Sequence, residues 1–269
     1  MAGGKELALR IRRFDPSVEK SPHYQQYAVP LNDGMTVLDA LLYAKDRLDH
    51  GIAMRFSCRM ASCGSCGMKV NGRPRLACET QVEELGSPTI TVEPMDNFPI
   101  VRDLVVDLES FFSKHRGITP RIVRKGDPKE QDSPSGEYLM TPAELDSFVQ
   151  FTYCIKCGLC SSSCPTTSTD SLFPGPQALA QAYRFLADVR DEGGDERLDL
   201  VDTQHGVWRC HFAGTCSAVC PKGVDPALGI QLLKRHVMAA RSPFRRRGSK
   251  SSAGAKLSPN PNKDLLKRP

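Results

Sequence analysis

The sequence of 269 residues lacks any long hydrophobic run. Its longest apolar stretches are a few residues, such as Leu41-Leu42, whereas a membrane-spanning helix needs about 20. The N-terminal region is charged from Lys5 onward, which interrupts the apolar region of a secretory signal peptide. We therefore expect no membrane span and a reducing compartment, where clustered cysteines are more often metal ligands than disulfides.

Motifs of nucleotide-dependent and zinc-dependent enzymes are also missing from the sequence. There is no Gly-rich dinucleotide loop, no phosphate loop and no His-Glu-x-x-His. Gly193-Gly194 lies among acidic residues and is interpreted as a surface turn. The content of hydrophobic (40%) and charged (25%) residues is that of a globular protein. The sequence thus predicts a folded chain with no catalytic residue of its own.

Net positive charge is absent outside the C-terminal end. Residues 241–269 contain nine Lys or Arg and one acidic residue, a net charge of +8. The preceding 240 residues hold 27 bases and 30 acids, a net charge of −3. A nucleic-acid-binding domain carries its basic residues on a folded face, so nucleic acid is excluded as a partner. We expect the tail to be irregular by itself and to lie along a partner subunit or an anionic membrane surface.

The first 116 residues have the pattern of a small α+β domain. Alternating residues predict strands at 6–14 and 24–29, and a third strand at 89–93. Thr36 and Asp39 form a capping box for a helix that buries Val37, Leu41, Ala44 and Leu48. Asn71-Gly72, between strands at 68–70 and 73–77, predicts a type I′ hairpin. A helix is expected over 100–115.

The remainder is predicted to be all-α. Residues 117–137 form a connector rich in Pro, Gly and charge, where the domain boundary is placed. One helix is expected to begin at Thr141-Pro142, and two more are expected over 177–189 and 226–238. The predicted domains are residues 1–116, residues 117–240 and a basic tail, 241–269.

The eleven cysteines fall into three clusters, and the first is Cys58-x4-Cys63-x2-Cys66-x11-Cys78. This is the spacing with which plant-type ferredoxins hold a 2Fe–2S cluster. Gly64 and Gly67 let the loop approach the cluster closely. A structural zinc site is the alternative, but zinc sites favour two Cys-x2–4-Cys pairs and only one such pair is present.

The second and third clusters follow the bacterial ferredoxin pattern. Cys154-x2-Cys157-x2-Cys160-x3-Cys164-Pro is complete, whereas Cys210-x5-Cys216-x3-Cys220-Pro has Ala213 at its middle position. In such pairs the last cysteine of each run binds the other cluster. This rule predicts a 4Fe–4S site of Cys154, Cys157, Cys160 and Cys220, and a 3Fe–4S site of Cys164, Cys210 and Cys216. The three sites use all eleven cysteines.

With these three motifs, in order and spacing, residues 5–240 resemble the iron–sulfur subunits of succinate dehydrogenase and fumarate reductase (respiratory complex II). The run Cys220-Pro-Lys-Gly-Val-Asp-Pro226 adds to the likeness. The resemblance implies a β-grasp plant-type ferredoxin domain followed by an all-α bacterial-ferredoxin-like domain. It also implies a flavoprotein partner that carries FAD, and a quinone-binding membrane anchor that in some members holds haem. The chain would then lie at the cytoplasmic face of the cell membrane, or at the mitochondrial inner membrane in a eukaryote.

The resemblance further implies a quinone pocket beside the three-iron cluster, at Pro165, Thr166, His211 and Lys234. His211 could instead simply pack beside Cys210, and Lys234 could be a solvated helix residue. Many succinate-oxidising members have a tryptophan shortly after the Cys-Pro, and residues 166–170 have no aromatic. The missing aromatic fits a menaquinone-linked or fumarate-reducing relative at least as well as a succinate-oxidising relative with the usual ubiquinone pocket. A soluble fumarate reductase subunit and a stand-alone multi-cluster ferredoxin are the competing hypotheses.

Overall fold

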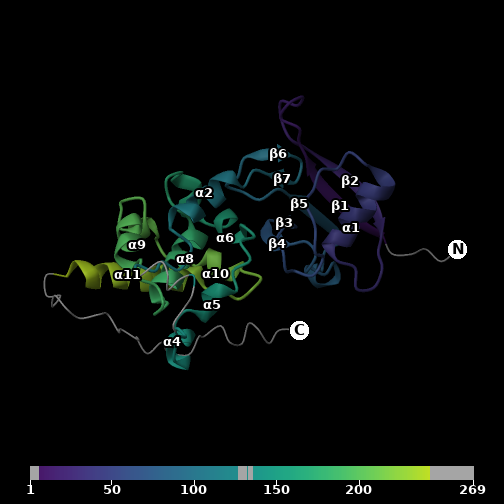
Figure 1. Ribbon diagram of the computed structural model, residues 1–269. Helices are drawn as coiled ribbons and strands as arrows, with labels where there is room; N and C mark the ends of the chain where they lie inside the picture. The colour runs from purple at the N-terminus through teal and green to yellow at the C-terminus, as the bar shows by residue number, and fades with distance from the viewer. Residues whose placement is uncertain (1–5, 127–131, 133–135, 243–269) are drawn as a thin grey trace. The chain divides into compact units, whose positions relative to one another are not determined.

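The computed structural model describes residues 6–126, 132 and 136–242. The chain forms two compact units, one of Met1–Ser110 with Ile155–Ser163 and one of Phe111–Cys154 with Cys164–Pro269 (Figure 1). From residue 243 the predicted basic tail lies outside the described residues, as does most of 127–135 in the connector. Over the described part of the chain, no helix is long and apolar enough to cross a bilayer.

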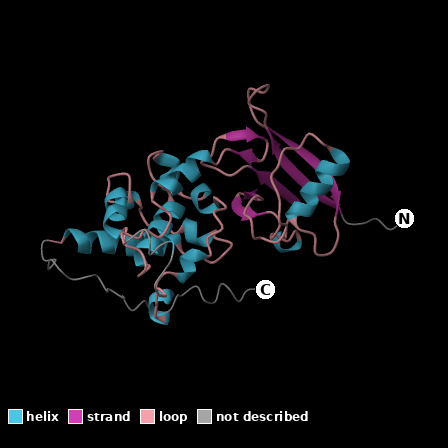
Figure 2. Ribbon diagram, viewed as in Figure 1, coloured by secondary structure: helices cyan, strands magenta, loops and turns pink. Residues whose placement is uncertain are grey.

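The first unit is built on a five-stranded sheet, drawn in magenta in Figure 2. Its strands are β1 (Glu6–Arg13), β2 (His23–Pro30), β3 (Gly67–Val70), β4 (Arg73–Leu76) and β5 (Thr89–Glu93), in the order β2-β1-β5-β3-β4. The central β1 and β5 run parallel, and the other pairs are antiparallel. Leu7, Leu9 and Ile11 of β1 are buried, so the strand predicted from alternation is confirmed.

The predicted capping box forms at the start of α1 (Val37–Tyr43). The Thr36 hydroxyl accepts from the Asp39 N–H, and the Asp39 carboxylate accepts from the Thr36 N–H. After Tyr43 the chain continues as a π-helix, η1 (Ala44–Leu48). The wider π turn rotates Leu48 away from the buried face, so Leu48 is 48% exposed and its predicted burial is wrong.

The hairpin predicted at Asn71-Gly72 is present between β3 and β4. Both residues have positive φ, +46° and +76°, as a type I′ turn requires. The hairpin begins one residue after Cys66 and ends two residues before Cys78. The Ala77 N–H donates to the Cys66 carbonyl at 3.1 Å, which holds these two cysteines side by side.

The helix predicted over 100–115 is wrong in its first half. Residues 100–106 form a hairpin of β6 (Ile100–Arg102) and β7 (Val105–Val106), and only α2 (Glu109–Gly117) is helical. The β-branched residues here favour strands. Asp103 adopts the left-handed turn conformation, with φ +47°, so the helical spacing of Ile100 and Leu104 was coincidental.

The buried carboxylate of Asp103 binds three groups from other parts of the first unit, and replacing Asp103 with alanine is expected to be strongly destabilising. Its buried carboxylate accepts from the N–H groups of Phe14 and Ala53, both at 2.9 Å, and lies 3.1 Å from Arg13 Nε. Asp103→Ala leaves these donors without their acceptor and should lower the free energy of unfolding by about 3 kcal/mol. Urea unfolding of the cluster-loaded protein measures this.

Asp96 provides the control for that experiment. Its carboxylate is half-exposed and pairs with Lys69 at 3.0 Å. Because exposed ion pairs contribute little, Asp96→Ala should cost less than about 1 kcal/mol. Equal losses for the two variants would contradict the role given to Asp103.

The described part of the second unit is helical, with no strand after residue 141. In addition to α2 it contains α4 (Pro142–Asp146), α5 (Val149–Thr152), α7 (Pro165–Thr169), α8 (Pro176–Ala187), α9 (Gly194–Val201), the 3₁₀ turn η3 (Val207–Arg209), α10 (Thr215–Ala218) and α11 (Pro226–Arg241). The short α6 (Leu159–Ser162) and the 3₁₀ turn η2 (Glu83–Leu85) belong to the first unit. The predicted helices at 141, 177–189 and 226–238 are confirmed.

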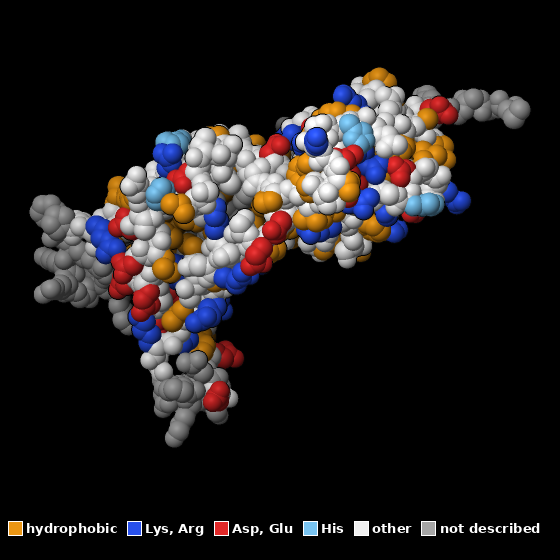
Figure 3. Space-filling model, turned by 90° about the horizontal axis from the view of Figure 1, so that it is seen from above, with side chains coloured by type: hydrophobic (Ala, Val, Ile, Leu, Met, Phe, Trp, Pro, Cys, Tyr) orange, Lys and Arg blue, Asp and Glu red, His pale blue; other side chains and the backbone are white. Residues whose placement is uncertain are grey.

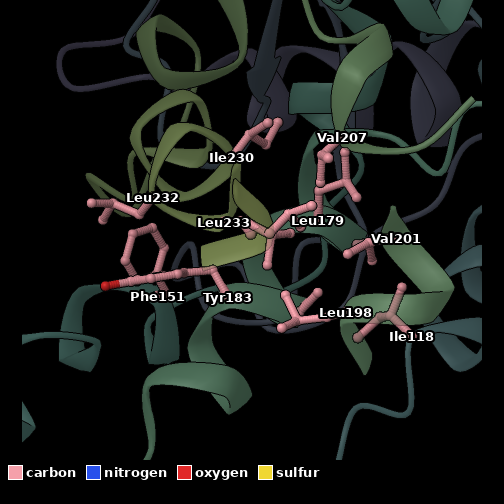
Figure 4. Close-up of a cluster of buried hydrophobic side chains, with 14 of the residues drawn as sticks. Ile118, Phe151, Leu179, Tyr183, Leu198, Val201, Val207, Ile230, Leu232 and Leu233 are labelled. Carbon is pink, nitrogen blue, oxygen red and sulfur yellow. The ribbon is translucent and has the colours of Figure 1, made fainter. Parts of the chain in front are cut away.

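The core of the second unit lies between α8 and α11. Leu179 and Tyr183 of α8 and Ile230 and Leu233 of α11 are buried together there (Figure 4). The two helices approach closely at Gly229 of α11, where an added Cβ would lie 3.3 Å from the Cα atom of Ala180 in α8. This core holds in place the short loops and helices that carry the cysteines.

The surface turn predicted at Gly193-Gly194 is wrong, because these residues begin α9. Arg197 of α9 is 1% exposed and pairs with Asp191 at 2.6 Å. Its guanidinium also donates to the carbonyls of Thr119 and Arg121 in the connector. On the face of the molecule shown in Figure 3, acidic and basic side chains are interspersed.

Candidate metal centres

The loop after Cys58 directs backbone N–H groups at cysteine sulfur atoms. The N–H groups of Met60, Ser62 and Cys63 point at Cys58 Sγ, at 3.5, 3.3 and 3.2 Å. The N–H of Ala61 points at Cys78 Sγ at 3.3 Å. Donors gathered around thiols stabilise thiolates, which are the form that binds metal.

This geometry requires an unusual backbone. Arg59 and Ala61 have φ of +56° and +54°, and Gly64 has φ +75°. A side-chain-bearing residue in this region costs about 1–2 kcal/mol, and such strain is concentrated at functional sites. The loop therefore has a strained backbone conformation that directs N–H groups at the sulfur atoms, at a cost in folding stability.

The four cysteines of the first motif fall into two environments. Cys63 is exposed, and hydrogen bonds, chiefly from the Ser65 hydroxyl, lower its pKa to about 6. Cys66 and Cys78 are buried at the two ends of the β3-β4 hairpin, and burial raises the pKa of Cys66 to about 12. Iron displaces the proton from a thiol on binding, so Cys66 becomes a thiolate at neutral pH when the metal binds.

The second and third motifs repeat one backbone conformation. Lys156 and Phe212 have φ of +56° and +59°. Gly158 follows with φ +82° and ψ −10°, and Gly214 with φ +75° and ψ −11°. In each loop the glycine carbonyl then accepts two N–H groups of a short helix, α6 or α10.

Aligning the two motifs by their cysteines gives Ala213 the position of Cys157. Each residue follows the left-handed one and precedes the left-handed glycine. The backbone that presents a ligand in the second motif is thus kept in the third motif without the thiol.

The three cysteines predicted for the 3Fe–4S site lie together in the second unit. The pKa of Cys216 is raised to about 11, mainly by burial and also by the charges of neighbouring Cys164 and Cys210. These three residues line a surface hollow together with three of the predicted quinone residues, Pro165, Thr166 and His211. Lys234 does not line the hollow, but its Nζ donates to the Cys210 carbonyl at 2.8 Å.

The cysteines predicted for the 4Fe–4S site are divided between the units. In the second unit, Cys220 is near Cys154: burial raises the pKa of Cys220, and the charge of Cys154 adds to the effect. Cys157 and Cys160 lie in the segment Ile155–Ser163 of the first unit.

The donor set fits iron–sulfur clusters. All eleven cysteines are free thiols, and none is in a disulfide. Over the described residues, no three Cys, His, Asp or Glu side chains converge as ligands of one metal ion. Thiolate ligands with backbone N–H donors aimed at sulfur are the environment in which protein Fe–S clusters are bound.

Comparison with known proteins also indicates iron–sulfur clusters. Residues 8–113 match the family model of the 2Fe-2S iron-sulfur cluster binding domain, and residues 150–224 match that of the 4Fe-4S dicluster domain. A fumarate reductase iron-sulfur subunit of Mycobacterium tuberculosis is 46% identical over 85% of this chain and 91% of its own. The chain belongs to the family of iron–sulfur subunits of fumarate reductase and succinate dehydrogenase.

Other members of the family cover the same region. The fumarate reductase iron-sulfur subunit of Haemophilus influenzae is 43% identical over 86% of this chain and 92% of its own. The succinate dehydrogenase iron-sulfur subunit of Coxiella burnetii is 35% identical over 86% and 97%. A chain of the Mycobacterium smegmatis Sdh1 complex is 28% identical with a TM-score of 0.79, over 90% of this chain and all of that one.

These findings confirm several predictions made from the sequence. The protein is an iron–sulfur subunit of an oxidoreductase complex, and its domain order, 2Fe–2S and then 4Fe–4S, is as expected. The predicted cofactors, the 2Fe–2S, 4Fe–4S and 3Fe–4S clusters, are those of the family. Sequence reasoning missed Asn97, whose side-chain amide donates to the carbonyls of Ser161 and Ser162 at 2.9 and 3.1 Å.

Proposed function

We propose that this subunit relays electrons between the FAD of a flavoprotein subunit, where succinate and fumarate interconvert, and a quinone at a membrane anchor. The observation that carries the proposal is that the chain has eleven free cysteines, which the motif spacings divide without remainder into sets of four, four and three. The sets are Cys58, Cys63, Cys66 and Cys78 for 2Fe–2S; Cys154, Cys157, Cys160 and Cys220 for 4Fe–4S; and Cys164, Cys210 and Cys216 for 3Fe–4S. The clusters supply the one-electron chemistry, and the protein supplies their order and surroundings.

The fold names and the location belong to the same proposal. A sheet with parallel central strands packed with one main helix supports a β-grasp ferredoxin fold for residues 1–116. The repeated loops support a bacterial-ferredoxin-like fold for residues 117–240. With no spanning helix among the described residues, attachment to the cytoplasmic face of a membrane would be through the anchor subunit.

We further propose that Pro165, Thr166 and His211 form the chain's part of the quinone site, since they line the same hollow as Cys164, Cys210 and Cys216, which would hold the adjacent cluster. Pro165 and His211 are exposed there, which favours a ligand-facing role for His211 over packing beside Cys210. An imidazole can hold or release a proton near neutral pH, so His211 is suited to proton exchange with a reduced quinone oxygen. Lys234 supports this wall of the hollow through its bond to the Cys210 carbonyl.

The quinone is proposed to be menaquinone. Residues 166–170 lack the tryptophan of many succinate-oxidising relatives. The fumarate reductase subunits of Mycobacterium tuberculosis and Haemophilus influenzae are 46% and 43% identical to this chain, and the succinate dehydrogenase subunit of Coxiella burnetii is 35% identical.

Purification of the native complex tests the proposal. We expect the subunit to co-purify with a flavoprotein and a membrane anchor, with menaquinone identified by mass in the lipid extract. Electron spin resonance should detect signals of all three clusters. Recovery of the chain alone would instead support a stand-alone ferredoxin, and recovery with a flavoprotein but no anchor would support a soluble fumarate reductase.

A further inference from the structure

Gly64 lies between two ligands of the first cluster and touches a ligand of the second. It follows Cys63, and a Cβ added to it would lie 2.8 Å from Cys157 Cβ and 2.9 Å from Cys157 Cα. Both residues are in the first unit. Because one of these atoms is backbone, a change of side-chain rotamer could not relieve the overlap. The loop of one cluster thus contacts a ligand of the next cluster at a distance that only glycine permits.

Gly67 makes a second close contact on the same segment. Its added Cβ would lie 3.2 Å from the Cys157 carbonyl oxygen and 3.4 Å from the Leu159 side chain. The Gly67 N–H donates to the Gly64 carbonyl at 3.2 Å, so the two glycines belong to one turn. This turn forms a surface without side chains against which Cys157 lies.

The remainder of the segment Ile155–Ser163 is held from another side. The Asn97 side-chain amide, on a backbone with φ +66°, donates to the carbonyls of Ser161 and Ser162. An added Cβ at Gly158 would lie 3.4 Å from both Met95 and Phe98. The segment that carries Cys157 and Cys160 is therefore fastened to the sheet unit at its middle and at its end.

From these contacts we infer that Gly64 is a positioning residue for electron transfer from the 2Fe–2S to the 4Fe–4S cluster, with Gly67 in a supporting role. The inference rests on the proposed ligand sets. Functional geometries must be held to within about 0.5 Å. Because Gly64 follows one proposed ligand, Cys63, and lies against another, Cys157, its contact would help to set the separation of the two clusters when they are bound.

Gly64→Ala in the assembled complex tests this role. The new methyl group should displace Cys157 and weaken magnetic coupling between the reduced 2Fe–2S and 4Fe–4S clusters. We expect both signals at full intensity, with a severalfold lower half-saturation power for the 2Fe–2S signal. Amide hydrogen exchange over residues 155–163 should rise, which gives a readout independent of the clusters.

Gly72→Ala is the matched control. Gly72 has nearly the same φ, +76°, but an added Cβ meets nothing within 4 Å. It therefore carries the same backbone strain without displacing a ligand, and its coupling and exchange should equal those of the wild type. Equal coupling in Gly64→Ala and Gly72→Ala, with both clusters present, would overturn the inference.

Gly67→Ala covers the case in which Gly64→Ala does not assemble. Its milder contact with Cys157 should reduce the coupling in the same direction by a smaller factor. Full clusters with unchanged coupling in this variant would also overturn the inference. A wild-type complex without either signal would overturn the proposed function itself, which keeps the two failures distinct.

Discussion

Replacing Ala213 with cysteine is expected to convert the three-iron centre into a 4Fe–4S cluster. The backbone at Ala213 repeats that of Cys157, between left-handed Phe212 and left-handed Gly214. A thiol at this position would therefore be presented as Cys157 presents its own. With four thiolates available, the site can retain a fourth iron.

The change should also lower the reduction potential of the centre, because cluster type and net charge set that potential. For a one-electron centre, a shift of about 60 mV changes the equilibrium for electron delivery about tenfold. Quinone reduction should fall accordingly. Electron spin resonance of the oxidised complex should show near-complete loss of the three-iron signal.

Ala218→Cys is the control for Ala213→Cys. It adds a thiol to α10 at a position equivalent to Ser162, which is not a ligand. The three-iron signal should persist in this variant. Absence of such a signal from the wild-type complex would refute the ligand assignment.

Serine substitutions at Cys164 and Cys220 should damage opposite clusters. Cys164→Ser should abolish most of the three-iron signal and leave the 4Fe–4S cluster, although Cys164 ends the run of Cys154, Cys157 and Cys160. Cys220→Ser should have the reverse effect. The physical reason is that the last cysteine of each run lies beside the other run.

The pKa shifts of the thiols support this exchange. The charge of Cys164 raises the pKa of Cys216, and that of Cys154 raises the pKa of Cys220, in each case after burial. Iron content and spin resonance of each variant measure the loss. Spectra in which each substitution removes the cluster of its own run would contradict the pairing.

Local sequence signals predicted the elements that depend on few neighbours. The capping box at Thr36, the Asn71-Gly72 hairpin and the proline-started helices α4 and α11 are specified by adjacent residues, so they could be identified without tertiary information. The proposed grouping of the cysteines likewise rests on their spacing along the chain, and it stays a prediction.

Features that depend on packing were not predictable. Ile100 and Leu104 have helical spacing, but the carboxylate of Asp103 binds the distant Phe14 and Ala53, which stabilises a turn. Similarly, the sequence predicts that Gly64 lets its loop approach the first cluster, whereas the contact of Gly64 with Cys157, 93 residues later, could not be predicted. Contacts of this range leave no local pattern.

The matched loops at 154–163 and 210–219 show how one scaffold can serve two kinds of centre. They share the same order of left-handed residues, the same glycine and the same helical turn. Of the four cysteine positions in the pattern, only the second differs, with Cys157 in one run and Ala213 in the other. A single side chain therefore decides whether this scaffold offers four thiolates or three.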